Sequence, residues 1–246
     1  MTSSKALAPG DVVLVFGYGL HGQAVTNALS ARGIDVVVAD DKPGIAAVDH
    51  AAALGIELVV APDADQLGRL LERSTALVPT PGLPDGHPVF DVARAAAVPT
   101  VGEFDLARQW DDRPIVAITG TNGKTTVTTM VTDMLCRSGL NAVTAGNMEV
   151  PLVTAIDDEA IDLFVVEASS FRLGHAAAFA PAVAAWLNFD PDHLDVHGSL
   201  DAYEAAKARI WASLPADGVA VANAGDPVVM RNVPAGRRVD HVSEGA

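Results

Sequence analysis

The sequence has very little cysteine and few basic residues. Cys136 is its single cysteine, so it offers no disulfide framework and no thiolate zinc site, which fits a reducing compartment. Lysine and arginine number 16 against 31 aspartate and glutamate residues, and the net charge is −15. Nucleic acids and anionic membranes bind basic surfaces. We therefore expect neither of them as a partner.

Long apolar runs are also missing. No segment approaches the roughly 20 apolar residues of a transmembrane helix, and residues 1–5 contain no signal-peptide core. The sequence has no repeat of fixed period. At 246 residues the chain is long enough for one large or two ordinary domains, and half of its residues are hydrophobic, which is enough for a substantial core. We expect a cytoplasmic protein without membrane insertion, and a monomer.

The first half of the chain alternates between apolar and helical segments, which predicts a parallel sheet covered by helices. A glycine motif, Gly17-x-Gly19-x-x-Gly22, follows the first apolar segment. Such a turn brings backbone amides and a helix N-terminus to a pyrophosphate. Strands are expected at 12–16, 34–39, 57–61 and 76–79, and helices at 23–31, 63–73 and 88–97.

The residues of this turn do not by themselves identify its ligand. Asp40 follows the motif by about 20 residues, the position of the ribose-binding acid in NAD-binding proteins. A nucleotide sugar also carries a pyrophosphate, and the glycines could serve tight packing alone. Thr80-Pro81-Gly82 ends a later strand and is expected at the same edge of the sheet.

A second glycine-rich turn lies in the middle of the chain. Residues 114–118 indicate a buried strand, and residues 127–136 have a helical pattern. Small residues followed by Lys124 and Thr125 connect the two. Backbone amides of such a loop bind phosphates together with the helix N-terminus. The residues expected to bind ATP are Gly120, Thr121, Asn122, Gly123, Lys124, Thr125 and Thr126.

Lys124 and Thr125 are the residue types that a triphosphate site requires. Lys124 is expected to reach the outer phosphates, and the Thr125 hydroxyl to bind Mg²⁺. A standard Walker loop has its first glycine at position 118, where this chain has Ile118, and Gly120 stands two residues later. The loop is therefore a variant, and the alternative is an ordinary glycine-rich turn.

Two further positions carry metal-binding side chains. Glu167 directly follows the apolar strand 163–166, so its carboxylate is expected at the carboxyl edge of a sheet as a Mg²⁺ ligand. Residues 188–197 are dense in aspartate and histidine. They could bind zinc, but with no cysteine nearby a second Mg²⁺ bound by His193 is favoured.

Lys207 lies in the apolar stripe of an expected helix, residues 201–214, four residues after Tyr203. Such a lysine can extend its ammonium to water. Alternatively, burial lowers its pKa, and a neutral amine can react with CO₂ to give a carbamate that binds Mg²⁺. Both interpretations remain open from the pattern.

The polar segment 110–114 ends in a proline and suits a linker. It divides the chain into an expected Rossmann-like domain, 1–112, and an expected P-loop-type α/β domain, 113–246. The second domain has few closing elements, so we expect the sequence to be a fragment.

The ordered set of these motifs resembles the Mur ligases, ATP-dependent amino-acid ligases of peptidoglycan precursor synthesis. The segment Glu167–Phe171 most resembles the branch of the family that adds D-glutamate. The matching segments are Thr119–Thr126, Gly146-Asn147, Glu167–Phe171, Asn188 to Asp195, and Tyr203 to Arg209.

The resemblance implies that the first domain binds the UDP end of UDP-N-acetylmuramoyl-L-alanine and that the second binds ATP, with D-glutamate as the other substrate. It implies two Mg²⁺ ions, bound by Thr125, Glu167, His193 and Lys207 as a carbamate. The implied catalytic residues are Lys124, Glu167, His193 and Lys207. The implied substrate-binding residues are Gly19, Leu20, His21, Asp40, Asp41, Thr80, Pro81, Gly82, Asn147 and Ser169.

The sequence departs from the family pattern at three points. Met148-Glu149 replace Ile-Gly, Arg172 replaces glutamine, and the family's third domain is not in the sequence. We therefore expect this polypeptide alone not to catalyse ligation. The alternatives are another Mur-type ligase, including folylpolyglutamate synthase, an NAD-dependent oxidoreductase, and a non-catalytic UDP-sugar-binding module.

Overall fold

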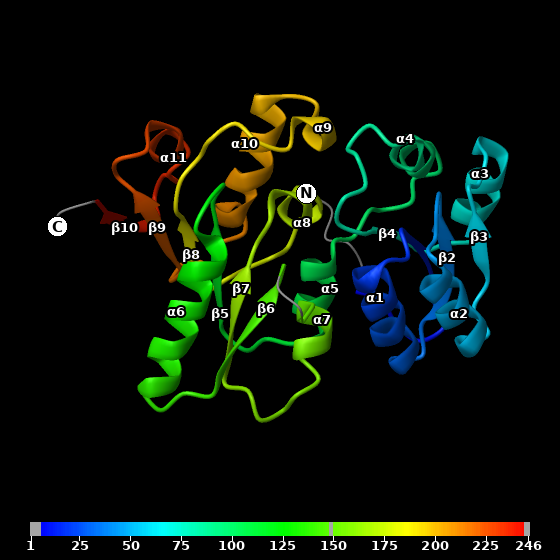
Figure 1. The fold of residues 1–246 in the computed structure, drawn as a ribbon, viewed down its shortest axis with the longest axis horizontal. Helices are drawn as coiled ribbons and strands as arrows, with labels where there is room; N and C mark the ends of the chain where they lie inside the picture. The colour runs from blue at the N-terminus through cyan, green and yellow to red at the C-terminus, as the bar shows by residue number, and fades with distance from the viewer. Residues whose placement is uncertain (1–5, 148–149, 244–246) are drawn as a thin grey trace. The chain divides into compact units, whose positions relative to one another are not determined.

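A computed structural model describes residues 6–147 and 150–243 (Figure 1). The chain forms two compact units, Met1–Glu103 and Phe104–Ala246. Each unit contains an all-parallel sheet with helices on its faces, which confirms the expected α/β class. No helix in the described part of the chain combines the length and the apolarity that a membrane crossing requires.

The sheet of the first unit has four strands in the order β3-β2-β1-β4. Its strands are β1 (Val12–Phe16), β2 (Asp35–Asp40), β3 (Leu58–Val60) and β4 (Ala76–Pro79). Its helices are α1 (Leu20–Ala31), α2 (Ile45–Leu54), α3 (Ala64–Glu72) and α4 (Pro88–Ala95).

Alternating strand residues divide the core of this unit into two layers. Val37 and Ala39 of β2 belong to the cluster that α3 and α4 cover, whereas Val38 packs with Ala47 and Ala51 of α2. Successive side chains of a strand point to opposite faces, so a buried parallel strand is apolar throughout. This explains why the apolar runs were recognisable in the sequence.

Helix α1 begins three residues earlier than expected. Gly19 is its N-cap and has an extended backbone, and no side chain caps the helix. The glycine motif is therefore the beginning of the helix rather than a separate loop. Helix α2 was not expected, because its alanine-rich sequence shows no clear amphipathic pattern.

The second sheet has six strands in the order β10-β9-β8-β5-β7-β6. Its strands are β5 (Ile115–Thr119), β6 (Ala142–Gly146), β7 (Leu163–Glu167), β8 (Val183–Trp186), β9 (Val219–Asn223) and β10 (Arg238–Val242). Strands β6 and β10 were not expected. The strands expected from about residues 115, 163, 183 and 219 are present, and their ends differ from the expected ones by at most one or two residues.

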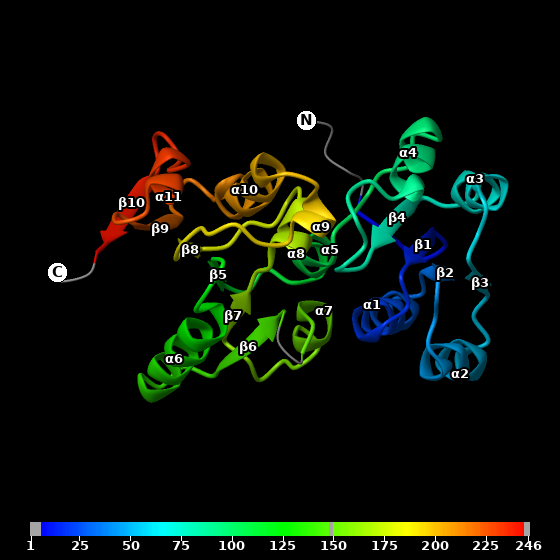
Figure 2. The ribbon, with the colours of Figure 1, turned by 45° about the horizontal axis from the view of Figure 1, so that its top comes forward.

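Helices cover both faces of this sheet. Helix α6 packs along β5, β6 and β7, and α8 and α10 lie on the other side (Figure 2). The helices are α5 (Glu103–Trp110), α6 (Lys124–Arg137), α7 (Leu152–Ala155), α8 (Ser170–His175), α9 (Leu194–His197), α10 (Leu200–Ala208) and α11 (Pro227–Arg231). The expected helix 201–214 ends at Ala208 and continues as a 3₁₀ turn, Arg209–Trp211.

Helix α5 packs within the second unit. The ring of Phe104 stacks on that of Phe179 at 4.6 Å. The carboxylate of Asp105 accepts hydrogen bonds from the amides of Ala177 and Ala178 at 2.7 and 2.8 Å. The two compact units therefore divide at 103/104, and the functional boundary at 112/113 stays a prediction.

In each sheet the first strand lies between two later ones. β1 lies between β2 and β4, and β5 lies between β7 and β8. Where strand order reverses, the connections leave in opposite directions and a crevice opens at the carboxyl ends of the strands. The two glycine-rich turns follow β1 and β5, so each stands at such a switch point.

Candidate functional site

The turn after β5 ends at the N-terminus of a long helix. Gly123 has φ +79°, a conformation that favours glycine, and it is the N-cap of α6. No side chain caps this helix. The first amides of α6 therefore stand at the positive end of the helix dipole, where phosphate groups bind.

Lys124 folds back over this turn. Its Nζ donates hydrogen bonds to the carbonyl oxygens of Gly120 and Thr121, at 3.0 and 2.9 Å. The ammonium is thereby held next to the phosphate loop.

Glu167, at the end of β7, connects two other expected site residues. The Thr125 hydroxyl donates to its Oε2 at 2.7 Å, and Asn147 Nδ2 donates to its Oε1 at 3.0 Å. Its side chain is buried. Gly146 approaches so closely that a Cβ there would lie 2.6 Å from the Glu167 carbonyl oxygen.

Mg²⁺ fits this group by the chemistry of its donors. Thr125 and Glu167 offer hard oxygen ligands beside a phosphate loop, and Mg²⁺ usually combines one or two protein oxygens with phosphates and water. Among residues 6–147 and 150–243, no three His, Cys, Asp or Glu side chains form a metal-binding group. The phosphates and water would therefore supply most of the ligands.

Lys207 is fully buried at 1 % exposure and does not reach solvent. Its Nζ donates to the Gly120 carbonyl oxygen at 2.7 Å and lies 4.6 Å from the centre of the Tyr203 ring. Burial, and secondly the charge of Lys124, lower the pKa of Lys207 to about 7. The snorkelling alternative is wrong, because the apolar stripe of α10 packs inward.

His193 lies at the start of α9 in a left-handed conformation, with φ +52°. Its Nε2 is 3.3 Å from Asp192 Oδ2, and its ring packs 4.8 Å from that of Phe171. The side chain is partly exposed. It stands on the loop after β8, as the sequence predicted, and the structure shows that β8 pairs with β5.

His197, four residues later, was missed as a site candidate. Its Nε2 lies 3.0 Å from the buried hydroxyl of Ser170, and its ring stacks on that of Phe171. Ser169, an expected substrate contact, is buried, and its hydroxyl has no hydrogen-bond partner among the described residues. The spacing of four between His193 and His197 was the available signal for a shared helix face.

Arg172, the replacement for the family's glutamine, lies at 4 % exposure. Its guanidinium sits 5.4 Å from the centre of the Phe104 ring, which ties α8 to α5. Burial lowers the pKa of Arg172 to about 9. The other departure, Met148-Glu149, lies outside the described residues.

The turn after β1 in the first unit is tightly packed. A Cβ on Gly22 would lie 2.1 Å from the Gly17 carbonyl oxygen, and a Cβ on Gly17 would lie 2.1 Å from the Thr80 hydroxyl. Gly19, by contrast, faces open space. The turn thus exposes backbone at Gly19 and at the first residues of α1, as a diphosphate site requires.

Asp40 supports this turn from β2. Its Oδ2 accepts the Tyr18 amide at 2.5 Å, and its Oδ1 accepts the Lys42 amide at 2.7 Å. The Tyr18 hydroxyl is 2.8 Å from His50 Nδ1, and burial raises the pKa of this phenol. The carboxylate of Asp40 therefore orders the backbone around the glycine motif.

Asp41 contacts His87, a residue that the sequence analysis did not single out. Its Oδ2 is 3.1 Å from Nε2 of His87, whose Nδ1 accepts the Val89 amide at the start of α4. The His87 ring packs 4.7 Å from that of Phe16. A histidine directly before the proline that opens a helix was the available signal.

The remaining expected residues of this unit surround the same edge. Leu20 is 63 % exposed at the start of α1, and His21 follows it. Thr80 donates its amide to the Phe16 carbonyl oxygen, so it continues β4 beside β1. Pro81 and Gly82 continue this turn, with Gly82 at φ +93°.

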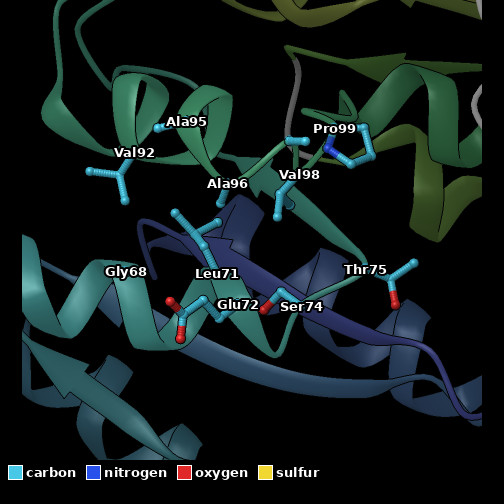
Figure 3. A pocket seen from close by; sticks show the side chains of 11 residues that line it. Gly68, Leu71, Glu72, Ser74, Thr75, Val92, Ala95, Ala96, Val98 and Pro99 are labelled. Atoms are coloured by element: carbon cyan, nitrogen blue, oxygen red, sulfur yellow. The ribbon is translucent and has the colours of Figure 1, made fainter.

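A pocket of about 570 Å³ in the first unit contains none of the predicted site residues (Figure 3). Leu71, Val92 and Val98 line it between the ends of α3 and α4, and Thr75 lies where β4 begins. It is therefore at the opposite end of β4 from the glycine turn.

Sequence comparison relates the chain to known ligases. Residues 118–245 match the family described as the Mur ligase middle domain. A UDP-N-acetylmuramoylalanine–D-glutamate ligase of Syntrophus aciditrophicus is 38 % identical over 220 residues, covering 89 % of this chain and 49 % of that protein. Another of the same name, from Frankia casuarinae, is 41 % identical over 218 residues, covering 86 % and 45 %.

Solved structures share the fold. The ligase for UDP-N-acetylmuramate and L-alanyl-γ-D-glutamyl-meso-diaminopimelate from Neisseria meningitidis gives a TM-score of 0.60 at 18 % identity, covering 94 % of this chain and 77 % of that one. A murein peptide ligase from Psychrobacter arcticus gives 0.55 at 18 % identity, covering 95 % and 53 %. This chain spans about half the length of the curated relatives it matches. From the match to the middle domain over half of its residues, the chain belongs to the Mur ligase family.

Proposed function

We propose that this chain binds ATP in its second unit and UDP-N-acetylmuramoyl-L-alanine in its first, as part of a ligase that adds D-glutamate. The observation that carries the proposal is the cluster of Lys124, Thr125, Glu167 and Asn147 around one phosphate loop. The name shared by the curated relatives supports the choice of substrates.

The proposed reaction transfers a phosphoryl group and then forms an amide. The terminal carboxylate of the UDP substrate attacks the γ-phosphorus of ATP, and ADP leaves. The amine of D-glutamate attacks the carbonyl carbon of the resulting acyl phosphate. Phosphate then leaves and the nitrogen loses a proton, which gives the amide.

The residues of the chain would act on the phosphates. Lys124 exchanges its two carbonyl partners for phosphate oxygens and balances their negative charge. Thr125 and Glu167 would hold Mg²⁺, which supplies positive charge beside the phosphates when bound. Asn147, positioned by Glu167, would contact the muramoyl part of the substrate.

Lys207 and His193 would hold a second Mg²⁺ if Lys207 is a carbamate. The lowered pKa leaves a substantial fraction of Lys207 as the neutral amine near pH 7. The amine nitrogen attacks the carbon of CO₂ and loses a proton, which converts a cation into a carboxylate-like ligand. In the structure its Nζ donates to Gly120, so this exchange requires the side chain to leave that carbonyl oxygen.

Isothermal titration calorimetry tests the proposal with the whole chain. We expect heat from ATP with Mg²⁺ and from UDP-N-acetylmuramoyl-L-alanine, and none from NADH. Lys124→Ala should weaken ATP binding and leave the UDP substrate unaffected, because the two glycine turns belong to different units. A folded chain that binds neither nucleotide would refute the proposal.

We also infer a cytoplasmic monomer, because the acidic composition and the single cysteine suit that compartment. Light scattering after gel filtration tests the oligomeric state. A dimer mass would contradict the inference.

A further inference from the structure

One side chain from outside the phosphate loop of the second unit forms hydrogen bonds with three backbone atoms of that loop. Asn188 follows β8, the neighbour of β5. Its Oδ1 accepts the amides of both Thr121 and Asn122, at 3.0 and 2.9 Å. Its Nδ2 donates to the Asn122 carbonyl oxygen at 3.1 Å. Three polar atoms of a two-residue stretch are thus satisfied by a single carboxamide.

Asn188 is itself firmly placed. Its carbonyl oxygen accepts the indole N–H of the buried Trp186 at 3.0 Å and the Thr121 amide at 3.2 Å. The neighbouring Leu187 carbonyl oxygen accepts Asn223 Nδ2 at 2.7 Å. Bonds to Trp186 of β8 and Asn223 of β9 therefore help to fix the position of Asn188.

A second connection joins the same two segments. The Thr121 hydroxyl accepts the amide of Asp190 at 3.0 Å and lies 3.1 Å from the hydroxyl of Tyr203. Tyr203 is fully buried on α10. The β8 loop and the phosphate loop are therefore joined by several hydrogen bonds.

The short loop explains why such a support is needed. The first glycine of a standard Walker loop would stand at Ile118, but the turn begins only at Gly120. The amides of Thr121 and Asn122 already donate hydrogen bonds to Asn188. The amides left for phosphate are those from Gly123 onward, at the uncapped start of α6.

We propose that Asn188 is a positioning residue for ATP, whose carboxamide presets the variant phosphate loop so that the α6 N-terminus faces the phosphates. The inference rests on the proposed ATP binding. A carboxamide is suited to this role because it accepts and donates at once and carries no charge. Aspartate keeps the acceptor, loses the donor and brings a negative charge next to the phosphates.

The test compares wild type, Asn188→Ala and Asn188→Asp with Asn232→Ala as the matched control. Asn232 is an asparagine of the same unit that donates to Glu204 and to the Val228 carbonyl oxygen, away from the loop. The dissociation constants of ATP and ADP with Mg²⁺, and of UDP, are measured for each. We expect Asn188→Ala to weaken ATP binding about tenfold, which corresponds to about 1.4 kcal/mol.

Asn188→Asp should weaken ATP binding more than ADP binding, and more at low salt, because the carboxylate repels the additional phosphate charge. A purely structural defect would not discriminate between the two nucleotides. UDP affinity should stay at the wild-type value in every variant, which reports a folded first unit. Asn232→Ala should change ATP affinity by less than about twofold.

Amide hydrogen exchange separates this inference from the proposed function. In wild type, we expect the Thr121 and Asn122 amides to be protected without nucleotide, and Asn188→Ala to remove that protection while Asn232→Ala keeps it. Wild-type protein that binds no ATP would refute the proposed function. ATP binding by Asn188→Ala at wild-type affinity, or unchanged protection of both amides, would overturn the role of Asn188.

Discussion

The Thr125 hydroxyl donates a 2.7 Å hydrogen bond to Oε2 of Glu167, and so joins the first turn of α6 to the end of β7. Neither residue is close to the other in the sequence. The bond places a hydroxyl and a buried carboxylate together at the edge where the phosphate loop begins. This is the oxygen pair that the proposed Mg²⁺ would use.

Replacing Thr125 tests this pair. Thr125→Ala removes the hydroxyl, so we expect ATP binding in the presence of Mg²⁺ to weaken about tenfold, or about 1.4 kcal/mol. Thr125→Ser keeps the hydroxyl and serves as the control, with affinity close to wild type. Calorimetric titrations with and without Mg²⁺ provide the measurement. Equal affinities of the alanine and serine variants would contradict the assignment.

Gly146 should tolerate no side chain. Gly146→Ala places a Cβ at positive φ and 2.6 Å from the Glu167 carbonyl oxygen. We expect the free energy of unfolding of the second unit to fall by more than about 2 kcal/mol. The strain of φ +96°, about 1–2 kcal/mol, adds to the clash. Urea denaturation followed by tryptophan fluorescence measures this loss, since Trp110, Trp186 and Trp211 all lie in the second unit.

Gly139→Ala is the matched control for Gly146→Ala. Gly139 has φ +95°, but a Cβ there would have no atom within 4 Å. In this variant the free energy of unfolding should fall only by the backbone strain, about 1–2 kcal/mol. An equal loss of stability in the two variants would show that the close approach to Glu167 has no energetic effect.

Two glycines of the first unit should respond differently to alanine. A Cβ on Gly22 would lie 2.1 Å from the Gly17 carbonyl oxygen, so Gly22→Ala should distort the turn and lower both stability and UDP affinity. Gly19 faces open space with φ −71°, so Gly19→Ala should fold normally. Its methyl group should still weaken UDP binding about tenfold by obstructing the backbone.

Circular dichroism melting and UDP titration separate the two outcomes. If Gly19→Ala binds UDP as wild type does, the diphosphate does not approach this turn. If Gly22→Ala is as stable as wild type, the turn is less tightly packed than the structure indicates.

The stability of the second unit should depend on pH through Lys207. Burial lowers the pKa of Lys207 from 10.5 to about 7, so between these values the unfolded chain binds a proton that the folded chain lacks. The free energy of unfolding should therefore rise with pH in this window, by at most about 1.4 kcal/mol per pH unit.

Lys207→Met removes this titration while filling a similar volume. We expect the difference in unfolding free energy, wild type minus variant, to increase from pH 7 to pH 9. Urea denaturation followed by tryptophan fluorescence at several pH values gives this difference. A constant difference across the range would show that burial does not lower the pKa of Lys207.

The sequence predicted the elements that carry a local pattern. The apolar runs at β1, β5 and β7 marked strands buried on both faces, and the glycine turns after β1 and β5 marked the starts of helices. Phosphate binding at these turns stays a prediction. Glu167 was identified for the same reason, because a carboxylate that ends a buried strand lies at the sheet edge. Each of these inferences depends only on residues close together in the chain.

Other features were missed because they depend on contacts between distant segments. Asn188 supports Thr121 and Asn122 only because β8 pairs with β5, and the strand order is not written in any local pattern. His87 meets Asp41 because the loop before α4 lies beside the loop after β2. Helix α5 packs with the second unit because Phe104 stacks on Phe179, a residue far from it in the sequence.

For this protein, the order of residues alone determined the α/β class, the two glycine turns and the chemical types gathered near them, since periodicity and short motifs act over neighbouring residues. Only the tertiary structure decided which side chains meet. The pairing of parallel strands brought Glu167 to Thr125 and Asn188 to the phosphate loop, and packing of α10 buried the Lys207 ammonium. Burial and distance set hydrogen bonds and pKa values, and both are properties of the folded chain.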